Sequence, residues 1–145
     1  MKLDIALFPF GVRPEVTRPD PAFLAFMGEE GIRQMVADHY DLLRNSAIKH
    51  LFPPTDEAFA QAKVNSADFM IQIMGGPQYF NEHRGKPMMA ARHSRFSITP
   101  EGRIVWLECY REVLQKLNAP ENLITSFWNY LNIFSVWMVN TPREA

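Results

Sequence analysis

Apolar side chains recur at the spacing of an α-helix along most of the chain that follows residue 21. Between residues 32 and 43 they fall at intervals of three and four, which places them on one helix face. The members of this face are Ile32, Met35, Val36, His39, Tyr40 and Leu43. A second such face is made of Phe59, Ala62, Ser66, Phe69, Met70 and Ile73. No segment alternates between apolar and polar residues as a strand does, so we expect an all-α fold with four main helices.

Capping residues predict where three of these helices begin or end. Thr55 is a candidate N-cap, and Gly75-Gly76-Pro77 should end the helix that it opens. Thr99-Pro100 should open a helix that runs to about residue 117. Pro120 should open the last helix, whose core positions are Leu123, Phe127, Leu131, Phe134 and Met138. Residues 77–99 are expected to be irregular, apart from a short helix at 87–93.

Residues 1–21 have a different pattern. Prolines at positions 9, 14, 19 and 21 exclude a long helix there. The many apolar residues argue against disorder. We therefore expect an N-terminal extension over 1–21, packed as an extended arm through Leu7, Phe8 and Phe10, and a globular domain over 22–145.

Composition narrows the classes of function. The 145 residues suit one domain, and a formal net charge of −1 without a basic face makes nucleic acid an improbable partner. The single cysteine, Cys109, cannot form an internal disulfide, so no oxidising compartment is implied. The longest apolar stretch, 127–139, is interrupted by polar residues and is too short to cross a membrane. Without a signal-peptide pattern at the N-terminus, we expect a cytoplasmic protein with no membrane partner.

Most familiar catalytic signatures are missing, and His93 is the residue that points to chemistry. The chain has no glycine-rich phosphate loop, no zinc-type spacing and no HExxH motif. Taken alone, His93 fits a structural or surface role. It ends a short predicted helix, however, and its neighbours include Met88, Met89, Phe96 and Ile98. A neutral imidazole in such surroundings can bind a metal through one nitrogen and bond the backbone through the other.

An ordered set of motifs around His93 resembles the truncated haemoglobins of the second group. The set is Gly75-Gly76-Pro77, Arg84-Gly85, Pro87, Arg92-His93, Phe96, Ile98 and Trp106-Leu107. Weaker similarities lie upstream in Gly28–Ile32, His39–Leu42 and Phe52-Pro53, and downstream in Trp128, Met138 and Asn140-Thr141. The resemblance covers roughly residues 23–141. It implies a globin-like fold of two helices over two, holding haem b (iron protoporphyrin IX).

The resemblance also implies a role for each matched residue. His93 matches the iron ligand, and Arg92 would pair with a haem propionate. Tyr40 and Trp106 match the distal residues that donate hydrogen bonds to the ligand. Periodicity alone favours the alternative that both are core aromatics bonded to the backbone. The implied cofactor contacts are Phe52, Ala62, Ser66, Phe69, Met89, Arg92, His93, Phe96, Ile98 and Trp106.

Three distal positions depart from the pattern of many relatives. Ala62 stands where many globins carry a polar gate, and Ser66, one turn later, stands where larger residues are usual. Two small side chains should leave an open distal route for ligands. Phe52 replaces a polar aromatic found in some relatives, so only Tyr40 and Trp106 are expected to donate.

The expected function is therefore reversible binding of dioxygen, nitric oxide and carbon monoxide. Oxygen transport or storage, nitric oxide dioxygenation and peroxidase-type chemistry all remain open, and the redox reactions require an electron donor. The alternatives are a gas or redox sensor, or a haem-free helical interaction module whose aromatics fill the cavity. The family resemblance also leaves a homodimer open.

Overall fold

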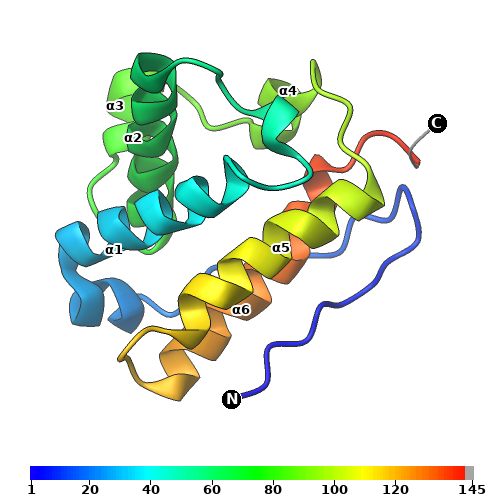
Figure 1. Ribbon diagram of the computed structural model, residues 1–145. Coiled ribbons are helices and arrows are strands. Elements are labelled where there is room, and N and C mark those ends of the chain that lie inside the picture. The colour runs from blue at the N-terminus through cyan, green and yellow to red at the C-terminus, as the bar shows by residue number, and fades with distance from the viewer. Residues whose placement is uncertain (143–145) are drawn as a thin grey trace.

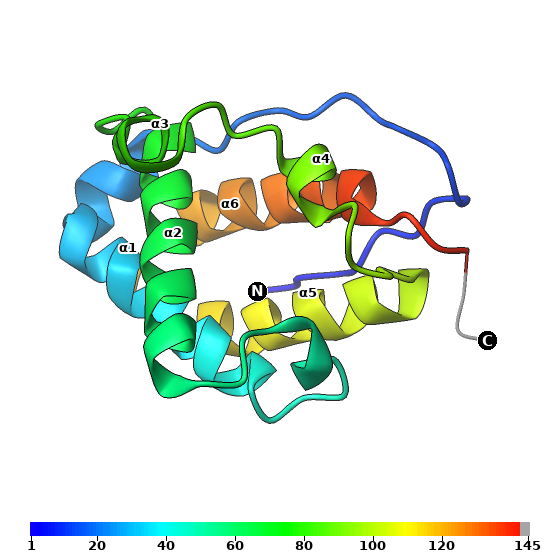
Figure 2. The same ribbon diagram turned by 90° about the horizontal axis from the view of Figure 1, so that it is seen from above.

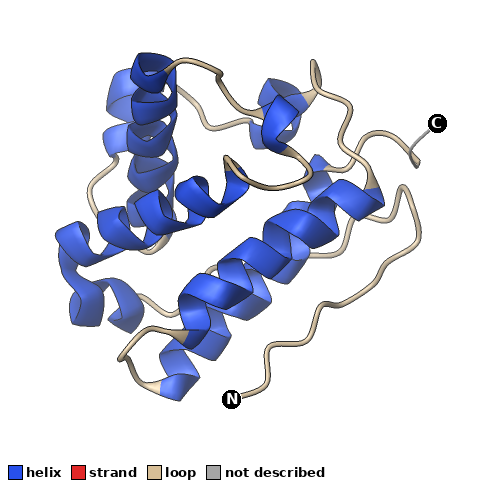
Figure 3. Cartoon of the chain, in the orientation of Figure 1, coloured by secondary structure: helices blue, strands red, loops and turns tan. Residues whose placement is uncertain are grey.

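The computed structural model describes residues 1–142, and within them the chain forms helices and connecting segments without a strand (Figures 1 and 3). The main helices are α1 (Ala22–Leu43), α2 (Asp56–Ile73), α5 (Pro100–Gln115) and α6 (Glu121–Phe134). Two short helices, α3 (Tyr79–Arg84) and α4 (Met89–His93), connect α2 to α5. Two 3₁₀ turns, η1 (Lys49–Leu51) and η2 (Ser135–Met138), follow α1 and α6. This arrangement confirms the predicted all-α class with four main helices.

The helices pack as two pairs. α1 lies against α2, α5 lies against α6, and the first pair crosses the second (Figures 1 and 2). The core between the pairs contains the largest fully buried side chains, among them Trp128, Tyr110, Phe23 and Phe127. The four α-helices α1, α2, α5 and α6 thus form the two-over-two globin fold.

The predicted helix ends are close to the observed ones. The Thr55 hydroxyl accepts a hydrogen bond from the Ala58 amide at 3.2 Å, and Thr99 accepts one from Gly102 at 3.0 Å. Each such cap satisfies an amide that has no partner inside its helix. Gly75 follows α2 with a φ of 90°, the left-handed conformation that glycine adopts without strain. The last helix ends at Phe134, and the predicted core stripe continues to Met138 through the η2 turn.

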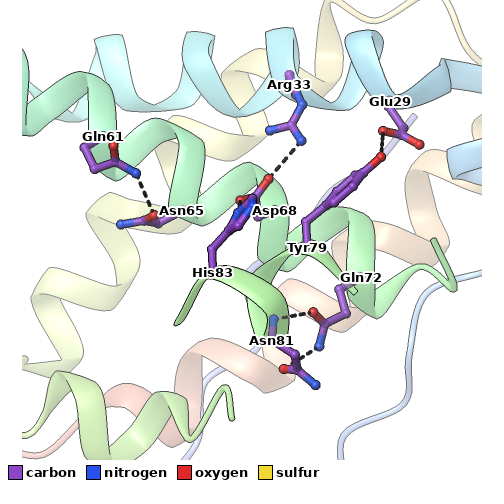
Figure 4. Close-up of polar contacts among 9 residues, drawn as sticks. All are labelled: Glu29, Arg33, Gln61, Asn65, Asp68, Gln72, Tyr79, Asn81 and His83. Carbon is purple, nitrogen blue, oxygen red and sulfur yellow. Dashed lines mark hydrogen bonds and ion pairs between the residues drawn. The ribbon is translucent and has the colours of Figure 1, made fainter. Parts of the chain in front are cut away.

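The sequence did not predict α3, because this helix is held by contacts distant in the chain. It has six residues, no side-chain cap, and Phe80 as its only buried residue. Its polar side chains bond to α1 and α2 in three places, shown in Figure 4: Tyr79 to Glu29, His83 to Asp68 and Asn81 to Gln72. Asp68 is only 2% exposed and also pairs with Arg33 at 2.8 Å. These bonds fix α3 and so set the position of Phe80.

The N-terminal arm lies as an extended segment along α5 and α6 (Figure 2). Its main-chain carbonyls accept two indole N–H groups, Trp128 to Asp4 at 2.8 Å and Trp137 to Pro14 at 2.7 Å. The Ala6 amide donates to the Asn132 side chain at 2.8 Å. We call this contact the arm seam.

The residues predicted to pack the arm were partly wrong. Leu7 and Phe10 are 75% and 52% exposed, whereas Leu3 is buried at 3%. The hydrogen bonds of the arm seam press residues 3 to 6 against the helices. The chain then turns at residues 9–12, where the Val12 amide donates to the Pro9 carbonyl, and the side chains beside this turn face solvent. Phe8 is half-buried.

Candidate functional site

A cavity of about 500 Å³ lies between α2, the α3–α4 segment, the start of α5 and the η1 and η2 turns. Cavities of this size bind small molecules and cofactors. All the residues proposed from the sequence as site residues line it. They are Tyr40, Phe52, Ala62, Ser66, Phe69, Met89, Arg92, His93, Phe96, Ile98 and Trp106.

The charges in the cavity wall are of one sign. Four arginines, Arg84, Arg92, Arg95 and Arg103, line it, and among the described residues no aspartate or glutamate does. Most of the remaining lining side chains are apolar. An apolar cavity with positive groups and no carboxylates suits an apolar ligand that carries negative charge.

His93 is oriented by the backbone of its own short helix. Its Nδ1 lies 2.7 Å from the carbonyl oxygen of Met89. Since a carbonyl only accepts, Nδ1 carries the proton, and Nε2 keeps the lone pair that a metal needs. Met88, which precedes α4, has a φ of 40°, an uncommon conformation for a residue with a side chain. The bond from His93 Nδ1 to the Met89 carbonyl is the backbone bond that the sequence predicted.

Tyr40 contributes a phenol to the cavity. Its ring contacts Phe52 and Phe59, with centroid distances of 5.5 and 5.7 Å. Burial raises the pKa of the Tyr40 phenol above its usual value, against a smaller opposing effect from a side-chain hydrogen bond with Ser66. Tyr40 thus stays protonated at neutral pH, and its partner is a cavity side chain of α2 rather than the backbone.

Trp106 differs from the other two tryptophans. Trp128 and Trp137 donate their indole N–H groups to arm carbonyls. The Trp106 N–H has no acceptor among the described residues, although the residue lines the cavity. The position of the residue is fixed instead through its carbonyl, which accepts from His39 Nε2 at 3.1 Å. A donor therefore remains available in the cavity wall.

The distal face of α2 combines small and polar side chains. Ala62 and Ser66 line the cavity, as the sequence suggested. Gln61 and Asn65 also line it, and a 3.0 Å hydrogen bond links the two side chains (Figure 4). This pair was not among the residues predicted from the sequence, although its i, i+4 spacing on the helix of Ala62 could have indicated it.

Arg92 lies at the cavity but is bonded to the backbone. Its Nε donates to the Pro87 carbonyl at 2.6 Å, and one Nη donates to Arg84 and Lys86 carbonyls at 2.7 and 2.9 Å. The guanidinium also lies over the Phe80 ring, 5.1 Å from its centroid. Arg92 therefore closes the loop between α3 and α4, while its pairing with a propionate stays a prediction.

Arg103 is another cavity residue that the sequence did not predict. It is 6% exposed and lies one turn before Trp106 on α5. This i, i+3 spacing places both residues on the same face of the helix and was a usable signal. The sequence did not indicate that Arg103 is buried, because a charged arginine in a helix is usually a surface residue.

Comparisons with known proteins agree with this geometry. Residues 22–140 match the family model described as bacterial-like globin. The group 2 truncated hemoglobin YjbI of Bacillus subtilis is 30% identical over 117 residues, which cover 79% of this chain and 85% of that protein. The chain belongs to the group II truncated haemoglobins. The predicted family is thereby confirmed.

Solved structures of truncated haemoglobins show the same fold. The group II truncated haemoglobin of Bacillus anthracis has a TM-score of 0.78 at 26% identity, covering 83% of this chain and 98% of that one. The structure of phosphate-bound Hell's gate globin IV has a TM-score of 0.88 at 34% identity, covering 99% of this chain and 89% of that one. The match to Hell's gate globin IV thus extends over almost the whole chain, which includes most of the arm.

The residues of this truncated haemoglobin fit the haem that its family implies. The cavity has an imidazole with a free Nε2, an apolar wall and cationic side chains for two propionates. Its family therefore gives the protein a haem-based role in gas binding. Within the described residues, no helix has the length and apolar character that a bilayer crossing requires.

Proposed function

We propose that this truncated haemoglobin binds dioxygen, nitric oxide and carbon monoxide reversibly on haem b held by His93. The observation that supports the proposal most directly is the 2.7 Å bond between His93 Nδ1 and the Met89 carbonyl. This bond fixes the tautomer and the ring orientation, and it makes Nε2 a better ligand. The cavity also argues against the haem-free alternative, in which aromatic side chains would fill this space.

The distal residues would act on the gas. When bound, haem supplies the iron at which a diatomic ligand coordinates. Tyr40 keeps its proton because burial raises its pKa, so it can donate a hydrogen bond to a partly negative ligand. The unpaired N–H of Trp106 can donate a second one. Each donor contributes about 1–3 kcal/mol in a dry site, which slows ligand loss.

The same donors support nitric oxide dioxygenation as a redox activity. In this reaction nitric oxide, dioxygen and one electron give nitrate, and an external electron donor supplies the electron. The role of Tyr40 and Trp106 would be to hold and polarise dioxygen while nitric oxide enters beside Ala62 and Ser66. Peroxidase-type chemistry would use the same two donors.

The test is a titration of the apoprotein with haem, followed by absorption spectra in the ferric, ferrous and carbon monoxide-bound forms. We expect saturation at one haem per chain and a ferrous–carbon monoxide spectrum typical of histidine ligation. His93→Ala should lose this spectrum, and added imidazole should restore it. His50→Ala, a change at an exposed histidine, is the matched control and should behave as wild type. Haem binding that never saturates, or that His93→Ala leaves unchanged, would overturn the proposal.

A further inference from the structure

Arg103 is a buried cation in the cavity wall. Its Nε donates to the Ser135 hydroxyl at 2.9 Å, and one Nη donates to the Asn132 carbonyl at 2.7 Å. A guanidinium carries five N–H groups, so three of them have no acceptor among the described residues. Burial lowers the pKa of Arg103 from its usual value, yet arginine keeps its charge at neutral pH.

Arg103 also lacks a counter-ion among the described residues. Arg33 pairs with Asp68 at 2.8 Å and Arg44 pairs with Asp56 at 2.6 Å, but no described carboxylate forms an ion pair with Arg103. The Asn132 carbonyl belongs to the last turn of α6, where the helix dipole offers only about half a negative charge. A buried charge without a full partner costs free energy, so the cavity favours an anion at this place.

The arm excludes water from the other side of Arg103. The Phe8 ring lies over the guanidinium, 6.0 Å from its central carbon. Its neighbours Leu7 and Phe10 face solvent, so Phe8 is the residue of this part of the arm that covers the charge. Electrostatic attraction is stronger where water is excluded, which gives the arm a physical effect on the cavity.

We propose that Arg103 binds a carboxylate inside the cavity and that Phe8 strengthens this contact by excluding water. The carboxylate has two sources: a propionate of the bound haem, which rests on the proposed function, or a free small carboxylate such as formate. The Nε and Nη2 groups of Arg92 already donate to carbonyls, so Arg103 would be a second and more deeply buried cationic partner for a carboxylate beside Arg92.

The first experiment compares the affinity of the protein for haem b and for haem dimethyl ester, which has no carboxylates. Arg103→Gln keeps a side chain able to bond Ser135 and Asn132. If a propionate is the anion, this variant should bind haem b about 10- to 100-fold more weakly and the ester with unchanged affinity. Arg18→Gln, a change at an exposed arginine outside this cavity, is the control and should leave the affinity for haem b unchanged.

The second experiment adds sodium formate to the apoprotein, with sodium chloride at equal ionic strength as reference. If the anion is a free carboxylate, formate should raise the melting temperature of wild type by linkage and leave Arg103→Gln unmoved. Arg103→Gln that matches wild type in both experiments would overturn the proposal. A wild type that binds neither haem nor its ester would instead overturn the proposed function, and formate would then test Arg103 separately.

Phe8→Ala keeps the proposal testable if Arg103→Gln does not fold. It removes the cover without touching the guanidinium. We expect the preference for haem b over its ester, or the effect of formate, to fall about 3- to 10-fold. Phe10→Ala, a change at a phenylalanine that is 52% exposed, is the matched control in the same arm. Equal behaviour of Phe8→Ala and Phe10→Ala would contradict the role of the arm.

Discussion

The arm seam and the cavity differ in whether their hydrogen-bond donors have acceptors within the described residues. In the arm seam, the indole N–H groups of Trp128 and Trp137 are both satisfied by carbonyls. In the cavity, the Trp106 N–H and three N–H groups of Arg103 have no acceptor among the described residues. Residues of the same type therefore serve stability in one region and remain available to a ligand in the other.

The difference has an energetic meaning. A satisfied buried hydrogen bond contributes about 0.5–1.5 kcal/mol to stability, whereas an unsatisfied buried donor costs about 1–3 kcal/mol. The donors of the cavity wall are not among the fully buried unpaired atoms of the described residues, so they add to stability mainly when a ligand accepts from them. We infer that the arm seam stabilises the protein without a ligand, whereas the cavity donors do so when the cavity is filled.

Two buried polar groups outside the cavity also lack a hydrogen-bond partner among the described residues. Within residues 1–142, His39 Nδ1 and the Tyr110 hydroxyl have no hydrogen-bond partner, and neither residue lines the cavity. Their rings stack with centroids 3.6 Å apart. A ligand in the cavity cannot pair with groups that it does not reach, so the missing bonds of His39 Nδ1 and the Tyr110 hydroxyl should affect stability rather than ligand binding.

Acid should have the largest effect, through His39. Burial, opposed by the bond to the Trp106 carbonyl, lowers the pKa of His39 from 6.5 to about 3. The unfolded chain therefore binds a proton at His39 more readily than the folded protein does. The contribution of neutral His39 to the free energy of unfolding is complete above pH 6.5 and is lost as the pH falls toward 3. The loss from this residue should be on the order of 4 kcal/mol between pH 7 and pH 3.5.

Urea unfolding at a series of pH values measures this effect. His39→Gln has no titrating ring and can still donate to the Trp106 carbonyl, so its stability should fall less steeply with acid. His50→Gln, at an exposed position, should follow wild type. Parallel curves for wild type and His39→Gln would show that His39 is not the group responsible.

Trp128→Phe should have the next largest effect. It removes the bond to the Asp4 carbonyl and leaves a gap at a residue that is 2% exposed. We expect the free energy of unfolding to fall by about 2–4 kcal/mol. Chemical denaturation measures the loss, and the dioxygen dissociation rate of the variant should remain that of wild type. A large change in that rate would show that the arm seam also affects ligand binding in the cavity.

Tyr110→Phe should have the smallest effect, in the opposite direction. Removing a buried hydroxyl without a partner should raise the free energy of unfolding by about 1 kcal/mol. Tyr79→Phe is the matched control, because its hydroxyl donates to Glu29 at 2.9 Å and its loss should not stabilise the protein. Denaturation of both variants decides the point, and a Tyr110→Phe protein less stable than wild type would contradict the prediction.

The sequence predicted the features that depend on local chemistry. Thr55 and Thr99 mark helix starts because a hydroxyl there caps the amides that follow. The residues of the cavity wall were found because His93, Trp106 and their neighbours stand in an order that the family shares. Both kinds of signal are contained in short stretches of chain.

The features that the sequence did not predict depend on distant partners. Leu7 and Phe10 were expected inside, but bonds from Asn132 and Trp128 determine which part of the arm meets the helices. The bonds of Arg92 to backbone carbonyls and the burial of Arg103 follow from how the α3–α4 segment and α6 pack. No periodicity within one segment carries that information.

The dioxygen dissociation rate of the ferrous protein, measured by stopped flow, tests most directly whether the donors of the cavity wall hold the bound gas. Tyr40→Phe and Trp106→Phe each remove a hydrogen-bond donor from the cavity wall, so each rate should rise about 10-fold or more. Trp137→Phe removes an N–H that is already bonded in the arm seam and should leave the rate unchanged. Equal rates in wild type and in both cavity variants would show that Tyr40 and Trp106 do not donate to bound dioxygen.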